Sequence, residues 1–223
     1  MSANLPQAYK DGYKDFYGRD FIVTPDVLIP RPETEQIIDI VLNLAGKAYL
    51  PGVKPASRQL TEKPVILDVG TGSGCIAITI QKELPEAIVY ASDVSEKALD
   101  IAKKNATKHG SPTSFIISHL LNNVKFTPDV VIANLPYVDK NWDWLDKDSL
   151  SHEPSIALYA KDKGLKLIKE LVDQASEKQI SRLILEADPC QHTEIIDYAN
   201  KKKYSLDEIR GFILSFKNIH SRE

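Results

Sequence analysis

The sequence feature that most constrains the fold is an alternation of two kinds of segment from residue 65 onward. Short apolar runs rich in Val and Ile predict buried strands, and the stretches between them predict helices. Strands of this kind, separated by helices, are typical of a mostly parallel sheet that helices cover on both faces. The predicted strands span residues 65–69, 88–93, 114–118, 129–134 and 182–187, and the predicted helices lie near 74–83, 95–109, 160–178 and 190–202. Residues 204–219 predict two more strands, which would bring the sheet to seven strands.

Two shorter parts precede this alternation. The stretch around Gly18 alternates apolar and polar residues, and it predicts a short β-hairpin. A helix should begin at Pro32, because proline suits a first helical turn and Glu33 and Glu35 favour the positive end of the helix dipole. We therefore divide the chain into a hairpin and linker segment, residues 1–31, and one α/β domain, residues 32–223.

Composition and charge exclude several classes of protein. The chain has 223 residues, of which 43% are hydrophobic, and a net charge of −3, whereas a strong non-specific nucleic-acid binder would be basic. It has no apolar run of about 18 residues and no apolar segment near the N-terminus, so we expect neither a membrane span nor a signal peptide. The two cysteines lack C-x-x-C spacing and the histidines lack ligand spacing. These features predict a cytoplasmic protein with reduced thiols and no metal site.

The segment "DVGTGSG", residues 68–74, lies at the carboxyl end of the first core strand, the edge where parallel sheets bind ligands. Gly70, Gly72 and Gly74 have the spacing G-x-G-x-G, and glycine lets a ligand approach the main chain closely. The dinucleotide fingerprint has its third glycine one position later. This loop therefore suits a ligand with a carboxylate better than one with a pyrophosphate. A plain strand-to-helix turn is the alternative.

Asp93 ends the next core strand, about 20 residues after the glycines, the separation found in nucleoside sites. A carboxylate at this place can accept hydrogen bonds from both hydroxyls of a ribose. It can also cap the following helix together with Ser95. The glycine loop and Asp93 together look like the S-adenosylmethionine site of Rossmann-like methyltransferases.

The segment "ANLPYV", residues 133–138, ends the fourth core strand and should flank the same crevice. Pro136 has no N–H group and restrains Leu135, so the Leu135 carbonyl can point into a pocket. The side-chain oxygen of Asn134 is a second acceptor, and Tyr137 can lie against a planar group. This pattern fits the –NH₂ group of an amide or an amino-purine, and a simple strand-ending turn is the alternative.

A resemblance to the peptide chain release factor N5-glutamine methyltransferases covers about residues 5–175. It rests on four stretches in the order seen in that family: "FYGRDFIVTPDVLIPRPETE", "DVGTGSGCIAI", "ANLPYV" and "HEPSIALYAKDKGL". The resemblance implies a class I Rossmann-like fold, S-adenosylmethionine as cofactor, and methyl transfer to a glutamine amide in the Gly-Gly-Gln loop of a release factor. It implies cofactor contacts from Gly70, Thr71, Gly72, Ser73, Gly74, Asp93, Leu120 (near the adenine) and Asn134, and acceptor contacts from Asn134, Leu135, Pro136 and Tyr137.

The chain also departs from that family. Leu135 stands at a usual proline, while His119 and Lys161 stand at a usual acidic residue and a usual glycine. The family's N-terminal helical domain is not matched. The Leu-Pro-Tyr form also resembles ribosomal RNA adenine dimethylases. An adenine N6-methyltransferase acting on RNA or DNA is therefore the alternative function, and a non-catalytic S-adenosylmethionine-binding protein is a third hypothesis.

Two further expectations concern contacts. Arg31 is similar to a residue that lines the active cleft of the family, or it forms an ion pair with Glu33 or Glu35. Glu153 and Pro154 should order the loop that follows "NLPY". Because the chain is slightly acidic, we expect a protein substrate rather than a nucleic acid, and we expect a monomer.

Overall fold

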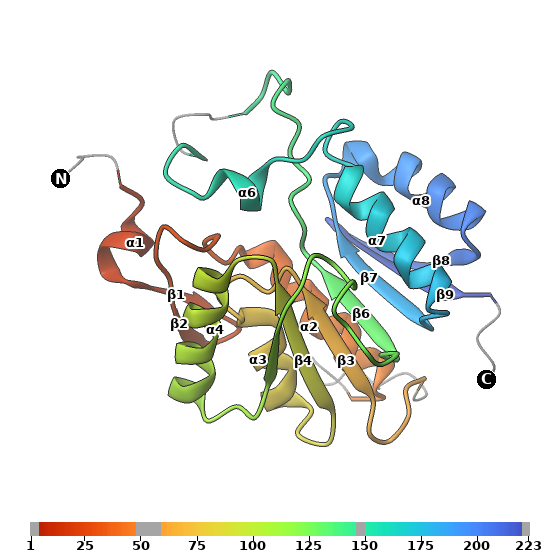
Figure 1. The fold of residues 1–223 in the computed structure, drawn as a ribbon, viewed down its shortest axis with the longest axis horizontal. Coiled ribbons are helices and arrows are strands. Elements are labelled where there is room, and N and C mark those ends of the chain that lie inside the picture. The colour runs from red at the N-terminus through yellow and green to blue at the C-terminus, as the bar shows by residue number, and fades with distance from the viewer. Residues whose placement is uncertain (1–4, 48–58, 146–149, 220–223) are drawn as a thin grey trace.

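A seven-stranded sheet forms the centre of the molecule, as the sequence predicted (Figure 1). The computed structural model describes residues 5–47, 59–145 and 150–219. The strand order is β5-β4-β3-β6-β7-β9-β8; the first five strands are parallel, and β9 and β8 are antiparallel to their neighbours. The strands are β3 (Val65–Val69), β4 (Ile88–Asp93), β5 (Ser114–Ile117), β6 (Val130–Ala133), β7 (Arg182–Glu186), β8 (Tyr204–Arg210) and β9 (Ile213–Asn218).

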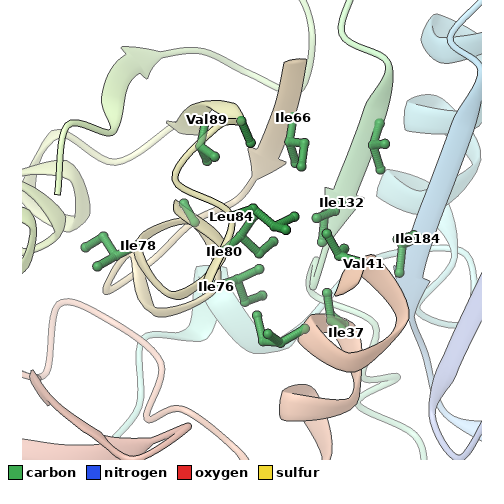
Figure 2. Close-up of a cluster of buried hydrophobic side chains, with 14 of the residues drawn as sticks. Ile37, Val41, Ile66, Ile76, Ile78, Ile80, Leu84, Val89, Ile132 and Ile184 are labelled. Atoms are coloured by element: carbon green, nitrogen blue, oxygen red, sulfur yellow. The ribbon is translucent and has the colours of Figure 1, made fainter. Parts of the chain in front are cut away.

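One face of the sheet is covered by α2 (Gln36–Leu44), α3 (Cys75–Glu83) and α4 (Glu96–His109). Figure 2 shows the apolar cluster beneath them, in which Ile37 of α2 and Ile80 of α3 meet Ile66 and Ile132 of the sheet. Full burial of such a side chain contributes about 1.5–3 kcal/mol. This cluster fixes α3 against β3, and it thereby fixes the loop that joins them.

The opposite face is covered by α7 (Lys166–Glu177) and α8 (His192–Lys201). Their apolar sides pack on the strand residues that alternate with the first set, such as Leu67, Val131 and Leu183. Because both faces are buried, the strands read as nearly continuous apolar runs. Within the described residues, no helix is both long enough and apolar enough to cross a membrane.

Three predicted helices begin differently from the expectation. The helix predicted from residue 160 starts at Lys166, because Asp162, Lys163 and Gly164 have positive φ values of 57°, 54° and 87°, which an α-helix excludes. The helix predicted from residue 190 is preceded by a 3₁₀ turn, η2 (Pro189–Gln191). The helix predicted from Pro32 likewise begins as a 3₁₀ turn, η1 (Pro32–Glu35), before α2.

The predicted N-terminal hairpin is present. It consists of β1 (Tyr13–Phe16) and β2 (Arg19–Ile22), and a short helix, α1 (Gln7–Asp11), precedes it. Phe16 and Phe21 are fully buried in the cluster of Figure 2. The side chain of Asn105 on α4 holds the end of β2 with two hydrogen bonds. It accepts from the Ile22 N–H at 2.7 Å and donates to the Ile22 carbonyl at 3.0 Å. The hairpin therefore packs on the α/β core, and a domain boundary at residue 31 stays a prediction.

Candidate active site

Four adjacent parallel strands end at the same level. The strand register places Ser92 of β4 beside Val69 of β3, Val69 beside Ala133 of β6, and Ala133 beside Leu185 of β7. The residues that follow these four therefore lie at one edge of the sheet. They are Asp93, Gly70, Asn134 and Glu186. This edge is the carboxyl edge, where parallel sheets bind ligands. Three of these four residues are ones that the sequence predicted for a site.

The glycine loop between β3 and α3 is held by main-chain hydrogen bonds. The N–H groups of Gly70 and Thr71 both donate to the Ser92 carbonyl, at 2.8 and 2.9 Å. The Thr71 hydroxyl donates to the buried Asp68 carboxylate at 2.6 Å. Burial raises the pKa of Asp68 to about 7. These bonds fix the loop before any ligand arrives.

The three glycines of the loop have different roles. Gly72 lines the main cavity with a φ of +55°, and a Cβ there would meet no atom within 4 Å, so a side chain would occupy open space. A Cβ on Gly74 would lie 2.9 Å from Ile78 Cδ1 and 3.1 Å from Ala102 Cβ, which are core atoms. The structure therefore brings Gly72 to the cavity and gives Gly74 a packing role, with a φ of +81° that favours glycine.

Asp93 joins the glycine loop to α4. One of its oxygens accepts from the Gly72 N–H at 2.9 Å, and the other accepts from the Ser95 N–H at 2.9 Å. Ser95, rather than Asp93, caps the helix, since its hydroxyl accepts from the Ala98 N–H. A carboxylate has about four acceptor sites, so Asp93 keeps acceptor capacity for a further donor. Burial raises the pKa of Asp93, and the hydrogen bonds from Ser95, Gly72 and Val94 oppose this rise.

The main cavity, of ≈ 270 Å³, lies over this edge. Its lining includes Gly70, Thr71, Gly72, Ser73, Asp93, Leu120, Asn134, Leu135 and Pro136, so it brings together the predicted cofactor residues except Gly74. Leu120 has a positive φ of 47°, and its carbonyl accepts from the Ser118 hydroxyl at 2.9 Å. The cavity wall opposite the sheet comes from two distant segments, residues 26–31 and the region of α6 (Ser155–Leu158).

An ion pair joins these two segments. Arg31 pairs with the buried carboxylate of Glu153, whose other oxygen accepts from the Ile29 N–H at 3.1 Å. The predicted pairing of Arg31 with Glu33 or Glu35 is therefore wrong: Glu35 accepts instead from the Tyr17 N–H at 2.8 Å. Glu153 has the ordering role that the sequence predicted, because it ties the loop after β6 to the linker before η1. Arg31 also lines the main cavity.

The "NLPY" segment separates the main cavity from a smaller one of ≈ 130 Å³. Asn134 and Leu135 line both cavities, Pro136 lines the main one, and Tyr137 lines the smaller one. The side-chain N–H₂ of Asn134 donates to the Thr34 hydroxyl at 3.2 Å, which leaves its Oδ1 as an acceptor. Within the described residues, no backbone N–H binds the Leu135 carbonyl. The two acceptors that the sequence predicted, Asn134 Oδ1 and the Leu135 carbonyl, therefore lie on adjacent residues.

The path of the chain after Asn134 is fixed by Gly164 and Gln191. The Gln191 side chain donates to the Tyr137 carbonyl at 2.8 Å. A Cβ on Gly164 would lie 1.9 Å from this carbonyl oxygen, so only glycine fits there. The glycine loop also touches this segment, because a Cβ on Gly70 would lie 3.0 Å from Leu135 Cδ2. The predicted cofactor and acceptor residues thus adjoin directly.

Sequence reasoning missed Thr34 and Glu186. Glu186 ends β7 with 1% of its surface exposed, and it lines the smaller cavity. The pKa of Glu186 is raised to about 7, first by burial and then by the negative charge of Glu33. An acidic residue at the carboxyl end of a predicted buried strand was a usable signal for Glu186. No local pattern marks Thr34, which reaches the site only because η1 packs beside β6.

Comparisons with known proteins agree with this geometry. Residues 54–146 match the family described as Methyltransferase small domain. A release factor glutamine methyltransferase of Koribacter versatilis is 39% identical over 77% of this chain and 58% of its own length. One from Bacillus cereus is 33% identical over 89% of this chain and 74% of its own length. The chain belongs to the release factor glutamine methyltransferase family.

Solved structures support the fold of this methyltransferase. A methyltransferase from Pyrococcus furiosus superposes with a TM-score of 0.63 at 19% identity, over 91% of this chain and 90% of the other. The chain spans little more than half of the Koribacter relative, and 42% of a bifunctional methyltransferase from Rickettsia bellii. The whole relatives' substrates and partners therefore do not pass to it automatically.

The cofactor of this family is S-adenosylmethionine. The main cavity fits it: Asp93 keeps acceptor capacity for a ribose hydroxyl, and the open space at Gly72 lets a ligand approach the main chain. When bound, S-adenosylmethionine supplies an electrophilic methyl group. The individual residue contacts with this cofactor stay predictions.

Proposed function

We propose that this methyltransferase modifies the side-chain amide nitrogen of a glutamine, in the Gly-Gly-Gln loop of a peptide chain release factor. The observation that carries the proposal is the pair of acceptors formed by Asn134 Oδ1 and the Leu135 carbonyl, at the boundary between the two cavities. Two acceptors match the two hydrogens of one –NH₂ group. The release-factor relatives name the acceptor class, and the protein is proposed to act on it in the cytoplasm.

The chemical difficulty lies in the acceptor. An amide nitrogen is a poor nucleophile, because its lone pair is delocalised into the carbonyl group. Asn134 and Leu135 would hold both hydrogens, which turns the nitrogen lone pair toward the main cavity. Tyr137 would support the planar amide from the smaller cavity. The nitrogen would gain the methyl group as the bond between this group and the sulfonium sulfur breaks, and it would release one proton to water, so the residues contribute positioning and electrostatics rather than a strong base.

The direct test is mass spectrometry of a release factor after reaction with the purified enzyme and S-adenosylmethionine. The proposal expects the mass of one methylene equivalent to be added to the peptide that contains the Gly-Gly-Gln loop. A release factor with asparagine in place of this glutamine is the matched control and should stay unmodified. If ribosomal RNA adenine gained the methyl group while the glutamine stayed unmodified, the adenine N6-methyltransferase hypothesis would replace this one.

A further inference from the structure

Glu186 is a buried acid that the proposed chemistry does not yet use. It is almost completely buried, and among residues 5–47, 59–145 and 150–219 its Oε2 atom has no hydrogen-bond partner. Its Oε1 atom accepts a long bond of 3.4 Å from the Tyr137 hydroxyl. A buried carboxylate with an unsatisfied oxygen costs stability, and such groups are concentrated at functional sites.

A chain of polar groups connects Glu186 to the proposed acceptor site. The Asn134 side-chain nitrogen donates to the Thr34 hydroxyl, so the oxygen of Thr34 acts as an acceptor. The Thr34 hydroxyl must then donate its own hydrogen elsewhere, and Thr34 is only 2% exposed. The carboxylate of Glu186, whose charged form the Thr34 side chain favours, is the acceptor that we assign to this hydrogen. Hydrogen-bond donation therefore runs from Asn134 to Thr34 and from Thr34 to Glu186.

An inference that rests on the proposed function follows from this direction of donation. We propose that the ionised Glu186 is a positioning residue, which fixes the amide of Asn134 with Oδ1 toward the acceptor nitrogen. A carboxylate can only accept, so Thr34 must donate to it and can only accept from the Asn134 nitrogen. A neutral Glu186 could donate to Thr34, which could then donate to Oδ1. The Asn134 –NH₂ group would then face the substrate –NH₂ group, donor against donor.

The charges around Glu186 set the pH range of this effect. Glu33 on η1 raises the pKa of Glu186, while the polar side chains of Thr34, Tyr137 and Asn134 favour its charged form. Asp188 and Glu33 act on Tyr137, and Cys75 on α3 is electrostatically coupled to Glu186. Arg31, which lines the same cavity, is paired with Glu153. On the neighbouring strand β9, the residue paired with Glu186 is the apolar Ile213. We expect turnover to rise with pH through about 7, as Glu186 ionises.

The first experiment needs no methyl acceptor. Side-chain amide signals of Asn134 are followed by ¹H–¹⁵N NMR between pH 5.5 and about 8.5, the range that brackets the raised carboxyl pKa, and are assigned with Asn134→Asp. We expect them to shift with a midpoint near 7 in the wild type. They should not titrate in Glu186→Gln, and they should shift less than in the wild type in Thr34→Val, which removes the Thr34 link with an isosteric side chain. Signals that do not titrate in the wild type, or that titrate unchanged in Glu186→Gln, would overturn the inference whatever the substrate is.

The second experiment measures methylation of a release factor across the same pH range. Glu186→Gln should lower kcat by about 10²-fold, the scale of a misplaced reacting group, and should lose the rise of kcat with pH. The affinity for S-adenosylmethionine should stay within about two-fold, because Glu186 does not line the main cavity. Thr79→Val is the matched control for Thr34→Val: Thr79 is also buried, but it lies on α3 outside both cavities, and its hydroxyl has no partner among the described residues.

The outcomes separate the two proposals. If the wild type methylates the release factor but Glu186→Gln retains its kcat and its pH profile, the positioning role fails and the proposed function stands. If the wild type leaves the release factor unmodified, the proposed function fails, and the NMR titration still decides whether Glu186 controls Asn134. A loss of activity in Thr79→Val equal to that in Thr34→Val would show a general packing effect and overturn the inference.

Discussion

The proposed site has a cofactor half and an acceptor half, and these are built from different kinds of chemical group. The cofactor half is mostly main chain: the N–H groups of Gly70, Thr71 and Gly72 bond at 2.8–2.9 Å to a neighbouring strand or to Asp93. The acceptor half is mostly side chain, with longer bonds of 3.2 Å from Asn134 to Thr34 and 3.4 Å from Tyr137 to Glu186.

This difference indicates how the two halves tolerate change. Main-chain contacts depend on the path of the backbone and not on the identity of each side chain. Side-chain contacts depend on the identity and orientation of each group. The acceptor half should therefore be the more sensitive half in turnover, and the cofactor half should govern cofactor affinity. Four predictions test this separation.

The largest effect is expected for Asn134→Ala. Removal of one of the two proposed acceptors should lower turnover by about 10³-fold, the upper range for loss of a single preorganised polar group. The dissociation constant of S-adenosylmethionine should change by less than about two-fold. Single-turnover methylation and calorimetry measure the two quantities, with Asn141→Ala as a control on an exposed asparagine of the following loop. An equal loss in both quantities would contradict the separation.

Glu186→Gln should make stability depend less on pH. The pKa of Glu186 is raised from 4.5 to about 7, so the stability that this shift contributes is complete below 4.5 and is lost as the pH rises to about 7. The glutamine variant lacks this loss. Its unfolding free energy relative to wild type should improve by ~3 kcal/mol from pH 4 to pH 9. Urea unfolding at both pH values measures this, and Glu177→Gln on the exposed side of α7 should show no comparable change.

Asp93→Ala should affect the cofactor half alone. Loss of the charged acceptor should weaken S-adenosylmethionine binding by about 1.5–3 kcal/mol, which is 10- to 100-fold in the dissociation constant. Turnover at saturating cofactor should fall much less than in Asn134→Ala. Calorimetry on the folded variant gives the affinity, and circular dichroism checks that the fold is intact. Unchanged affinity would remove Asp93 from the cofactor site.

The smallest effect is expected for Tyr137→Phe. The ring that would support the planar amide remains, and only the long hydroxyl bond to Glu186 is lost. Turnover should fall by less than about ten-fold, since a neutral hydrogen bond contributes about 0.5–1.5 kcal/mol. Because this bond favours the charged form of Glu186, its loss should move the pH profile of turnover upward. Tyr137→Ala should cost more than Tyr137→Phe; equal losses would give the ring no role.

The sequence could predict the cofactor half because that half is local. Gly70 to Gly74 occupy one strand-to-helix turn, and Asp93 follows at the end of the next strand. The acceptor motif, Asn134 to Tyr137, is also local and was predicted, but the groups that hold it lie far apart in the chain. Thr34 and Asn134 are 100 residues apart, and Arg31 and Glu153 are 122 residues apart. No spacing rule predicts such pairs, because each joins segments that only the folded chain brings together. The late start of α7 was missed because positive φ values at non-glycine residues leave little trace in the sequence.

The shared level of the four strand ends places a strict condition on insertions and deletions. One residue added within β3, β4, β6 or β7 would displace its terminal group by about 3.3 Å and turn it to the opposite face of the sheet. The turns that lead into the strands at the other edge, such as residues 84–87, 110–113 and 178–181, carry none of these groups. Length variation among natural relatives, and inserted tags or reporter domains, should therefore be tolerated at those turns and excluded from the four strands.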